Sequence, residues 1–122
     1  MDCRFISIII CVFLLGGCFT RSQEVKEYYE PLNVIQQQFY DIQTLYDTKK
    51  YIDTVQLGEI FIQRYPRDIL SVSVKYYVGS SYQKTNNLEE AEAYFTDILK
   101  NHSDDDWAKL ATVGLREIAD LK

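Results

Sequence analysis

The sequence predicts an all-α fold in which helical hairpins stack as a short solenoid of about two and a half repeats and end in a C-terminal capping helix. Beyond Pro31 no stretch alternates at period two, whereas apolar residues recur every three or four positions, as on one face of a helix. The chain also resembles itself when it is shifted by 37 positions. Its 122 residues are enough for one small domain, which we expect over residues 31–122.

An eleven-residue apolar run, Phe5–Leu15, precedes this domain and is followed by small residues. The run is shorter than the roughly 20 residues of a membrane-spanning helix, and it fits the apolar core of a secretory signal. The segment Leu15, Gly16, Gly17 and Cys18 resembles the bacterial lipobox. This resemblance implies that residues 1–17 are a lipoprotein signal peptide and that the Cys18 thiol is lipidated. The alternative is an ordinary secretory signal or an uncleaved anchor.

Residues 18–30 would carry the lipidated Cys18 and a polar, charged tether that leads to Pro31. Acyl chains would hold the chain on a membrane surface, since each buried methylene contributes about 0.8 kcal/mol. An extended tether rises by roughly 3.4 Å per residue. We therefore expect the folded domain to be anchored to lipid and still able to work away from it.

The first two helices of the domain have clear boundary signals. Pro31 suits the first turn of a helix whose apolar face begins at Leu32 and continues to Leu45. A second helix is expected from about Tyr51 to Arg64, and Pro66 stops it.

Three further helices follow after short connections. The third is expected from about Asp68 to Lys84 and the fourth from Leu88 to Asn101. Ser103 and Asp104 are expected to cap the fifth, which lies in a final half unit from Asp105 to Lys122. Five short helices with such connections predict an antiparallel array.

The shift by 37 positions aligns one helix pair with the next. It places Ile35 on Val72, Phe39 on Tyr76, Tyr40 on Tyr77, Leu45 on Tyr82, Tyr51 on Leu88, Asp53 on Glu90, Phe61 on Ile98 and Ile62 on Leu99. A repeat of this length is one helical hairpin, whose apolar face is covered when a neighbour stacks on it. The alternative is a generic helical bundle with a chance period.

The second hairpin resembles a tetratricopeptide repeat. Its residues Gly79, Tyr82, Leu88, Ala91, Phe95 and Leu99 have the spacing of that family. The first hairpin departs from the pattern, because Ile42 stands at the close-approach glycine position, Thr54 replaces the small alanine and Gly58 replaces the aromatic residue. We therefore expect looser packing between the helices of the first hairpin.

A narrower resemblance covers residues 34–121. The lipobox, the short tether and the patterns Y-x-x-[TA]…F-I-x-R-Y-P, Y-Y-V-G-x-S-Y and A-x-x-Y-F-x-x-[IL]-L resemble the amino-terminal part of BamD-type lipoproteins. These are subunits of the outer-membrane β-barrel assembly machinery and carry more repeats than this chain. The resemblance implies a lipid-anchored adaptor on the periplasmic side of the outer membrane. Its implied partners are the large β-barrel subunit and unfolded outer-membrane proteins. The alternative is an envelope scaffold lipoprotein that serves a peptidoglycan, division or secretion complex.

The tetratricopeptide resemblance also implies a protein-binding groove on the first helix of each pair. Rings and amides there could hold a polypeptide segment by stacking and hydrogen bonding, without covalent chemistry. One helix position of error turns a side chain by about 100°, so Phe39 and Tyr76 could equally belong to the core. The expected groove residues are Gln36, Phe39, Gln43, Tyr46, Asp47, Ser73, Tyr76, Ser80, Gln83 and Lys84.

Composition argues against the other classes of function. The net charge is −5 and there is no basic run, which argues against nucleic acid as the main partner. Cys3, Cys11 and Cys18 are the only cysteines and precede the folded part, so a disulfide framework or a cysteine nucleophile is not expected there. His102 is the single histidine. We therefore expect a binding protein with no catalytic residues, no metal site and no cofactor.

Overall fold

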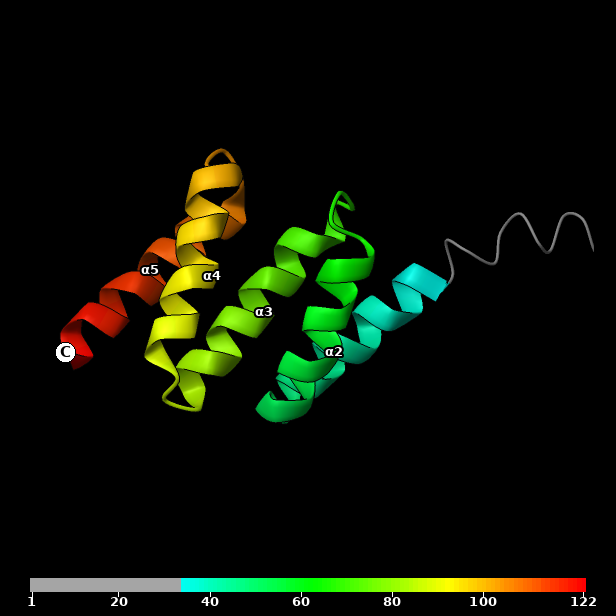
Figure 1. The fold of residues 1–122 in the computed structure, drawn as a ribbon, viewed down its shortest axis with the longest axis horizontal. Helices are drawn as coiled ribbons and strands as arrows, with labels where there is room; N and C mark the ends of the chain where they lie inside the picture. The colour runs from blue at the N-terminus through cyan, green and yellow to red at the C-terminus, as the bar shows by residue number, and fades with distance from the viewer. Residues whose placement is uncertain (1–33) are drawn as a thin grey trace, which may run out of the picture. The chain divides into compact units, whose positions relative to one another are not determined.

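A computed structural model describes residues 34–122 of the chain, and over these residues it contains only helices and the turns between them. A first helix spans residues 34–47. It is followed by α2 (Tyr51–Arg64), α3 (Leu70–Lys84), α4 (Leu88–Asn101) and α5 (Asp106–Leu121), as Figure 1 shows. The predicted all-α class is confirmed, and the predicted bounds of α2 and α4 agree with the structure.

Two predicted helix starts are wrong. Helix α3 begins at Leu70 and not at Asp68, because Asp68 lies before the helix and its Oδ1 accepts the Leu70 N–H at 2.9 Å. The cap of α5 is Asp105, whose Oδ1 accepts the Trp107 N–H at 3.4 Å. The two aspartates are 37 residues apart, and each accepts a hydrogen bond from the backbone N–H two positions after it.

Residues Gln37–Lys122 form one compact unit, and the three described residues before it belong to the first turn of helix 34–47. Within this unit each of α2, α3 and α4 packs against the helix that follows it, and α3 also packs against α5. The backbones of α2 and α4 do not meet, so α3 lies between them (Figure 1). The predicted hairpin organisation is present, and a solenoid stays a prediction.

The turns that close the two hairpins have the same backbone conformation. Lys49 and Asn86 both adopt left-handed conformations, with φ of 62° and 66°. The next residue in each turn donates its N–H to a carbonyl five residues back, from Lys50 to Leu45 at 2.9 Å and from Asn87 to Tyr82 at 2.8 Å. These are the bonds of a Schellman motif, which satisfies helix carbonyls that otherwise lack a partner. The predicted spacing of 37 residues therefore recurs in the hydrogen bonds of the turns.

The core of the second hairpin is built around Phe95. A Cβ atom on Gly79 of α3 would lie 3.0 Å from Phe95 Cε1, and one on Gly114 of α5 would lie 2.5 Å from Phe95 Cε2. The ring thus occupies the space that two glycines leave open, and it is fully buried. Val72, Ala91, Ile98, Ala108, Ala111 and Ile118 complete this cluster.

In the first hairpin the core side chains stand at different positions of the repeat from those in the second hairpin. Ile42 and Thr54, which replace the usual small residues, are buried, as is Phe61. Gly58 faces α3, where an added Cβ would overlap Val78 Cγ2. No helix within residues 34–122 is both long enough and apolar enough to cross a bilayer.

Candidate functional site

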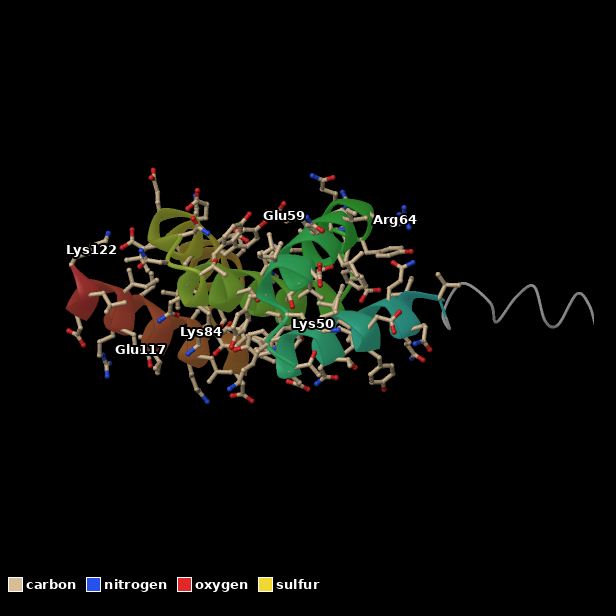
Figure 2. The ribbon with its side chains drawn as sticks, turned by 90° about the horizontal axis from the view of Figure 1, so that it is seen from below. Lys50, Glu59, Arg64, Lys84, Glu117 and Lys122 are labelled. Carbon is tan, nitrogen blue, oxygen red and sulfur yellow. The ribbon has the colours of Figure 1, made fainter. Side chains whose placement is uncertain are left out.

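The ten predicted groove residues all lie on helix 34–47 and α3. Two hydrogen bonds join these helices directly, from Gln43 Nε2 to Tyr77 Oη at 3.3 Å and between the hydroxyls of Tyr46 and Ser80 at 2.8 Å. Helix α5 packs beside α3 on the same side, where Gln83 Nε2 donates to Glu117 Oε2 at 2.9 Å. We call the surface of these three helices the inner face. Figure 2 shows Lys84 and Glu117 on this side and Glu59 of α2 on the opposite side.

The predicted residues differ in how far a partner could reach them. Ser73 and Ser80 are buried and lie beneath the surface. Gln36, Asp47 and Lys84 are exposed. Phe39, Gln43, Tyr46, Tyr76 and Gln83 are partly buried, so each presents only an edge to solvent. A partner can therefore reach less of the inner face than the ten predicted residues suggest.

A cluster of aromatic rings connects the three helices of the inner face. Tyr77 lies at its centre, with its ring centroid 5.0 Å from that of Tyr46 and 5.8 Å from that of Trp107. Tyr76 extends the cluster, since its centroid lies 5.4 Å from that of Trp107. Phe39 lies 6.3 Å from Tyr77 by the same measure. Aromatic pairs at these separations stabilise a packed surface beyond their burial.

Burial changes the acidity of the two central phenols. It raises the pKa of Tyr76, with a further rise from the nearby Tyr46 phenol and the Glu117 carboxylate. Burial also raises the pKa of Tyr77, and the charge of Asp47 adds to the rise. Both phenols therefore stay neutral at physiological pH and can donate hydrogen bonds.

Sequence reasoning missed two central members of this cluster. Tyr77 is buried and was expected only as a partner of Tyr40 in the repeat, and Trp107 is not among the expected groove residues. The pattern does not single them out, because an aromatic residue at helical spacing is most often a core residue. Here the core and the inner face share one set of rings.

Helix α5 adds an apolar ridge that was not predicted as part of the groove. Leu110, Val113 and Leu121 expose 43%, 47% and 66% of their surface, and Glu117 lies between them in the sequence. A signal for this ridge was present, since adding 37 to the positions of Ser73, Tyr76, Ser80 and Lys84 gives Leu110, Val113, Glu117 and Leu121. Helix α5 thus adds three exposed apolar side chains to the inner face.

The inner face offers apolar area, ring faces and amide groups. Within residues 34–122 no group of three or more His, Cys, Asp or Glu side chains is placed to hold a metal ion. The predicted lipidation site Cys18 and the lipobox residues Leu15, Gly16 and Gly17 lie outside the described residues. Comparisons with protein-family models, with curated proteins and with solved structures find no match to this chain.

Proposed function

We propose that this protein is a lipid-anchored adaptor that binds a segment of another polypeptide along its inner face. The observation that carries the proposal is the exposed ridge of Leu110, Val113 and Leu121, which runs beside the ring of Trp107 on α5. A folded domain of this size gains from covering such side chains, because apolar surface removed from water contributes about 25 cal/mol per Å².

The neighbouring groups suit a polypeptide in particular. Tyr76 and Trp107 supply rigid rings whose ordering costs little entropy, and Gln83 and Glu117 supply polar groups at the border. An apolar ridge with an aromatic edge and a polar border is the usual anatomy of a protein interface. We infer that a partner helix or extended segment contacts the ridge first and the rings second.

The resemblance to BamD-type lipoproteins supplies the rest of the proposal. Under it, Cys18 is acylated, the chain is held on the periplasmic side of the outer membrane, and the partner is the large subunit of the β-barrel assembly machinery. Unfolded outer-membrane proteins are a second proposed partner.

Affinity purification from detergent-solubilised membranes tests the partner. The wild-type chain should co-isolate a large barrel subunit, and Leu110→Glu with Val113→Glu should lower the yield about tenfold, as expected when apolar anchors of an interface are lost. Thr96→Glu is the matched control, because Thr96 is an exposed residue of α4 and not of the inner face. Co-isolation of wall-associated proteins instead would favour the envelope scaffold.

Two further measurements test the anchor and the pathway. Mass spectrometry of the protein from membranes should find an acylated Cys18 at the amino terminus, and an unmodified thiol would contradict the anchor. Depletion of the protein should lower the amount of porin-like proteins in the outer membrane. Unchanged porin levels would count against the assembly machinery, although not against polypeptide binding by the inner face.

A further inference from the structure

A second groove lies on the side of the molecule opposite the inner face. Helices α2 and α4 both pack on α3 without meeting at the backbone, and two cavities lie between side chains of α2 and those of its neighbours on this side. We call this the outer groove. Glu59 projects from α2 on this side, away from Lys84 and Glu117 (Figure 2).

The Glu59 carboxylate is held in place by two phenols at the centre of the outer groove. Tyr82 of α3 donates to Glu59 Oε1 at 2.7 Å, and Tyr94 of α4 donates to the same oxygen at 3.2 Å. The two rings are stacked, with centroids 5.9 Å apart. Both bonds go to Oε1, and Oε2 accepts no hydrogen bond from the described part of the chain. A fixed carboxylate oxygen is therefore available to a ligand.

No Lys, Arg or His side chain within residues 34–122 forms an ion pair with this carboxylate. The ion pairs found within residues 34–122 join Lys75 to Asp97, Lys109 to Asp106 and Lys122 to Glu92, and none of them includes Glu59. Lys75 lies near the groove but is held by Asp97 at 2.7 Å. The two phenol hydrogen bonds replace part of the solvation of this carboxylate, and Oε2 can accept a further hydrogen bond from a cation.

Nearby carboxylates contribute to the raised pKa of each phenol in the groove. Burial is the largest cause that raises the pKa of Tyr82 to about 12, and the hydrogen bond to Glu59 and the charges of Glu59 and Glu90 raise it further. The pKa of Tyr94 is raised by burial, by Glu59 and by Asp97. Burial disfavours either sign of charge, whereas the carboxylates disfavour only a negative one and attract a cation.

Apolar cavities lie on either side of this charged centre. One, of about 320 Å³, is lined mainly by Ile52 and Val55 of α2 with the ring of Tyr82. The other, of about 280 Å³, is lined by Ile62 of α2 and by Ala93 and Tyr94 of α4, with the Lys75–Asp97 pair beside them. The outer groove thus presents apolar walls at both ends and a carboxylate between them.

The repeat does not require this arrangement. A shift of 37 residues turns Glu59 into Thr96, and it relates Tyr82 to Leu45 and Tyr94 to Leu57. Leucines stand in place of the two phenols in the first hairpin, and a threonine stands in place of the carboxylate in the second, so a packed hairpin needs none of the three residues. The three residues are a departure from the repeat that brings polar groups from α2, α3 and α4 to one point.

We propose that the outer groove is a second docking surface, which binds a partner polypeptide through a Lys or Arg side chain flanked by apolar residues. The cation would pair with Glu59 Oε2 next to the two phenols, while the flanking side chains would fill the two cavities. A charge-assisted hydrogen bond in a partly buried site is stronger than an ion pair exposed to water. This proposal stands apart from the lipid anchor and from the inner face, and it would allow the protein to join two polypeptides.

Selection from a displayed library of random twelve-residue peptides tests the proposal. The full-length chain, purified in detergent and immobilised, is compared with Glu59→Gln under the same conditions. Glutamine keeps a carbonyl oxygen that accepts both phenol hydrogen bonds and removes only the charge. Peptides selected on the wild-type chain should be enriched about tenfold in a Lys or Arg with apolar neighbours, the ratio that one charged hydrogen bond gives. The enrichment should disappear on Glu59→Gln.

Two further variants separate the outer groove from the inner face. Ile52→Lys places a positive charge in one wall of the outer groove at a side chain that is 68% exposed, so the fold should tolerate it and the enrichment in basic peptides should fall. Val113→Glu on the inner face should leave the enrichment intact. Equal enrichment on the wild-type chain and on Glu59→Gln, or selected peptides without a basic residue, would overturn the proposal. Enrichment that is lost only in Val113→Glu would overturn it too and would support binding at the inner face.

Discussion

Helix 34–47 and α2 form the first helical hairpin, and α3 and α4 form the second. Their turns match, but the large interior side chain stands on the first helix in one hairpin and on the second helix in the other. Lys49 and Asn86 adopt the same left-handed conformation in the two turns. In the second hairpin a glycine, Gly79, stands on the first helix and the large ring of Phe95 on the second. In the first hairpin the equivalent positions hold Ile42 and Gly58, so the large residue is on the other helix.

This contrast separates two kinds of information in the repeat. Turn geometry depends on hydrogen bonds between residues a few positions apart, and it is the same in both hairpins. Interior volume depends on residues that meet across helices, and it can be supplied from either side as long as the space is filled. If the first hairpin is packed more loosely, as the sequence predicts, a substitution in its interior should lower the free energy of unfolding less than the equivalent substitution in the second hairpin.

The largest effect is expected for Phe95→Ala. The ring is buried between Gly79 and Gly114, which cannot fill the space that it would leave, so the free energy of unfolding should fall by about 4 kcal/mol. Urea denaturation followed by circular dichroism measures this loss. Ile42→Ala is the counterpart in the first hairpin and should cost less. A loss for Ile42→Ala as large as that for Phe95→Ala would show that both interiors are packed equally well.

Gly58→Ala should destabilise the protein by about 2 kcal/mol, because the added methyl group overlaps the fully buried Val78 side chain on α3. Gly79→Ala should cost less than Gly58→Ala, since its methyl group meets Phe95 and Tyr94 at 3.0 Å and alanine favours the helix. Thermal unfolding of the two variants side by side measures the difference. The reverse order would contradict the close approach of α2 to α3.

Lys49→Gly should stabilise the protein by about 1 kcal/mol, because glycine adopts the left-handed conformation without the steric cost that lysine bears. Asn86→Gly should give a smaller gain, since asparagine tolerates this conformation better. Both side chains are exposed, so few other contacts change. Equal gains in urea denaturation would show that the two turns bear the same strain despite their different residues.

The last prediction concerns the alkaline range and Tyr82, whose counterpart in the first hairpin is Leu45. The pKa of Tyr82 is raised to about 12 in the folded protein. Above pH 10 the unfolded chain releases this proton while the folded chain keeps it, so the free energy of unfolding should fall as the pH rises from 10 to 12. Tyr82→Phe should make this fall less steep in urea denaturation at alkaline pH. An unchanged slope would contradict a raised pKa at this position.

Much of the fold could be predicted from the sequence. The bounds of α2 and α4 followed from Pro66 and from apolar spacing, and the period of 37 residues recurs in the turns. The starts of α3 and α5 were misplaced, because Asp68 and Asp105 act as caps only once the preceding turn aims their carboxylates at N–H groups of the next helix. A sequence pattern does not distinguish neighbouring aspartates in this respect.

The inner face could be predicted only in part. The sequence placed the candidate residues on two helices, and all of them lie there, but it did not show that Ser73 and Ser80 are buried or that Tyr77 joins the three helices. The outer groove was not predicted at all. Glu59, Tyr82 and Tyr94 are far apart along the chain, and no local pattern connects them.

By itself the sequence determined the class of fold, the length of the repeat and the turns, because these depend on propensities and hydrogen bonds among residues within a few positions of each other. Only the tertiary structure decided which rings belong to the core, which apolar residues of α5 stay exposed and where a carboxylate meets two phenols. Those outcomes depend on how helices are rotated against one another, and a rotation of one position moves a side chain by about 100° around its helix.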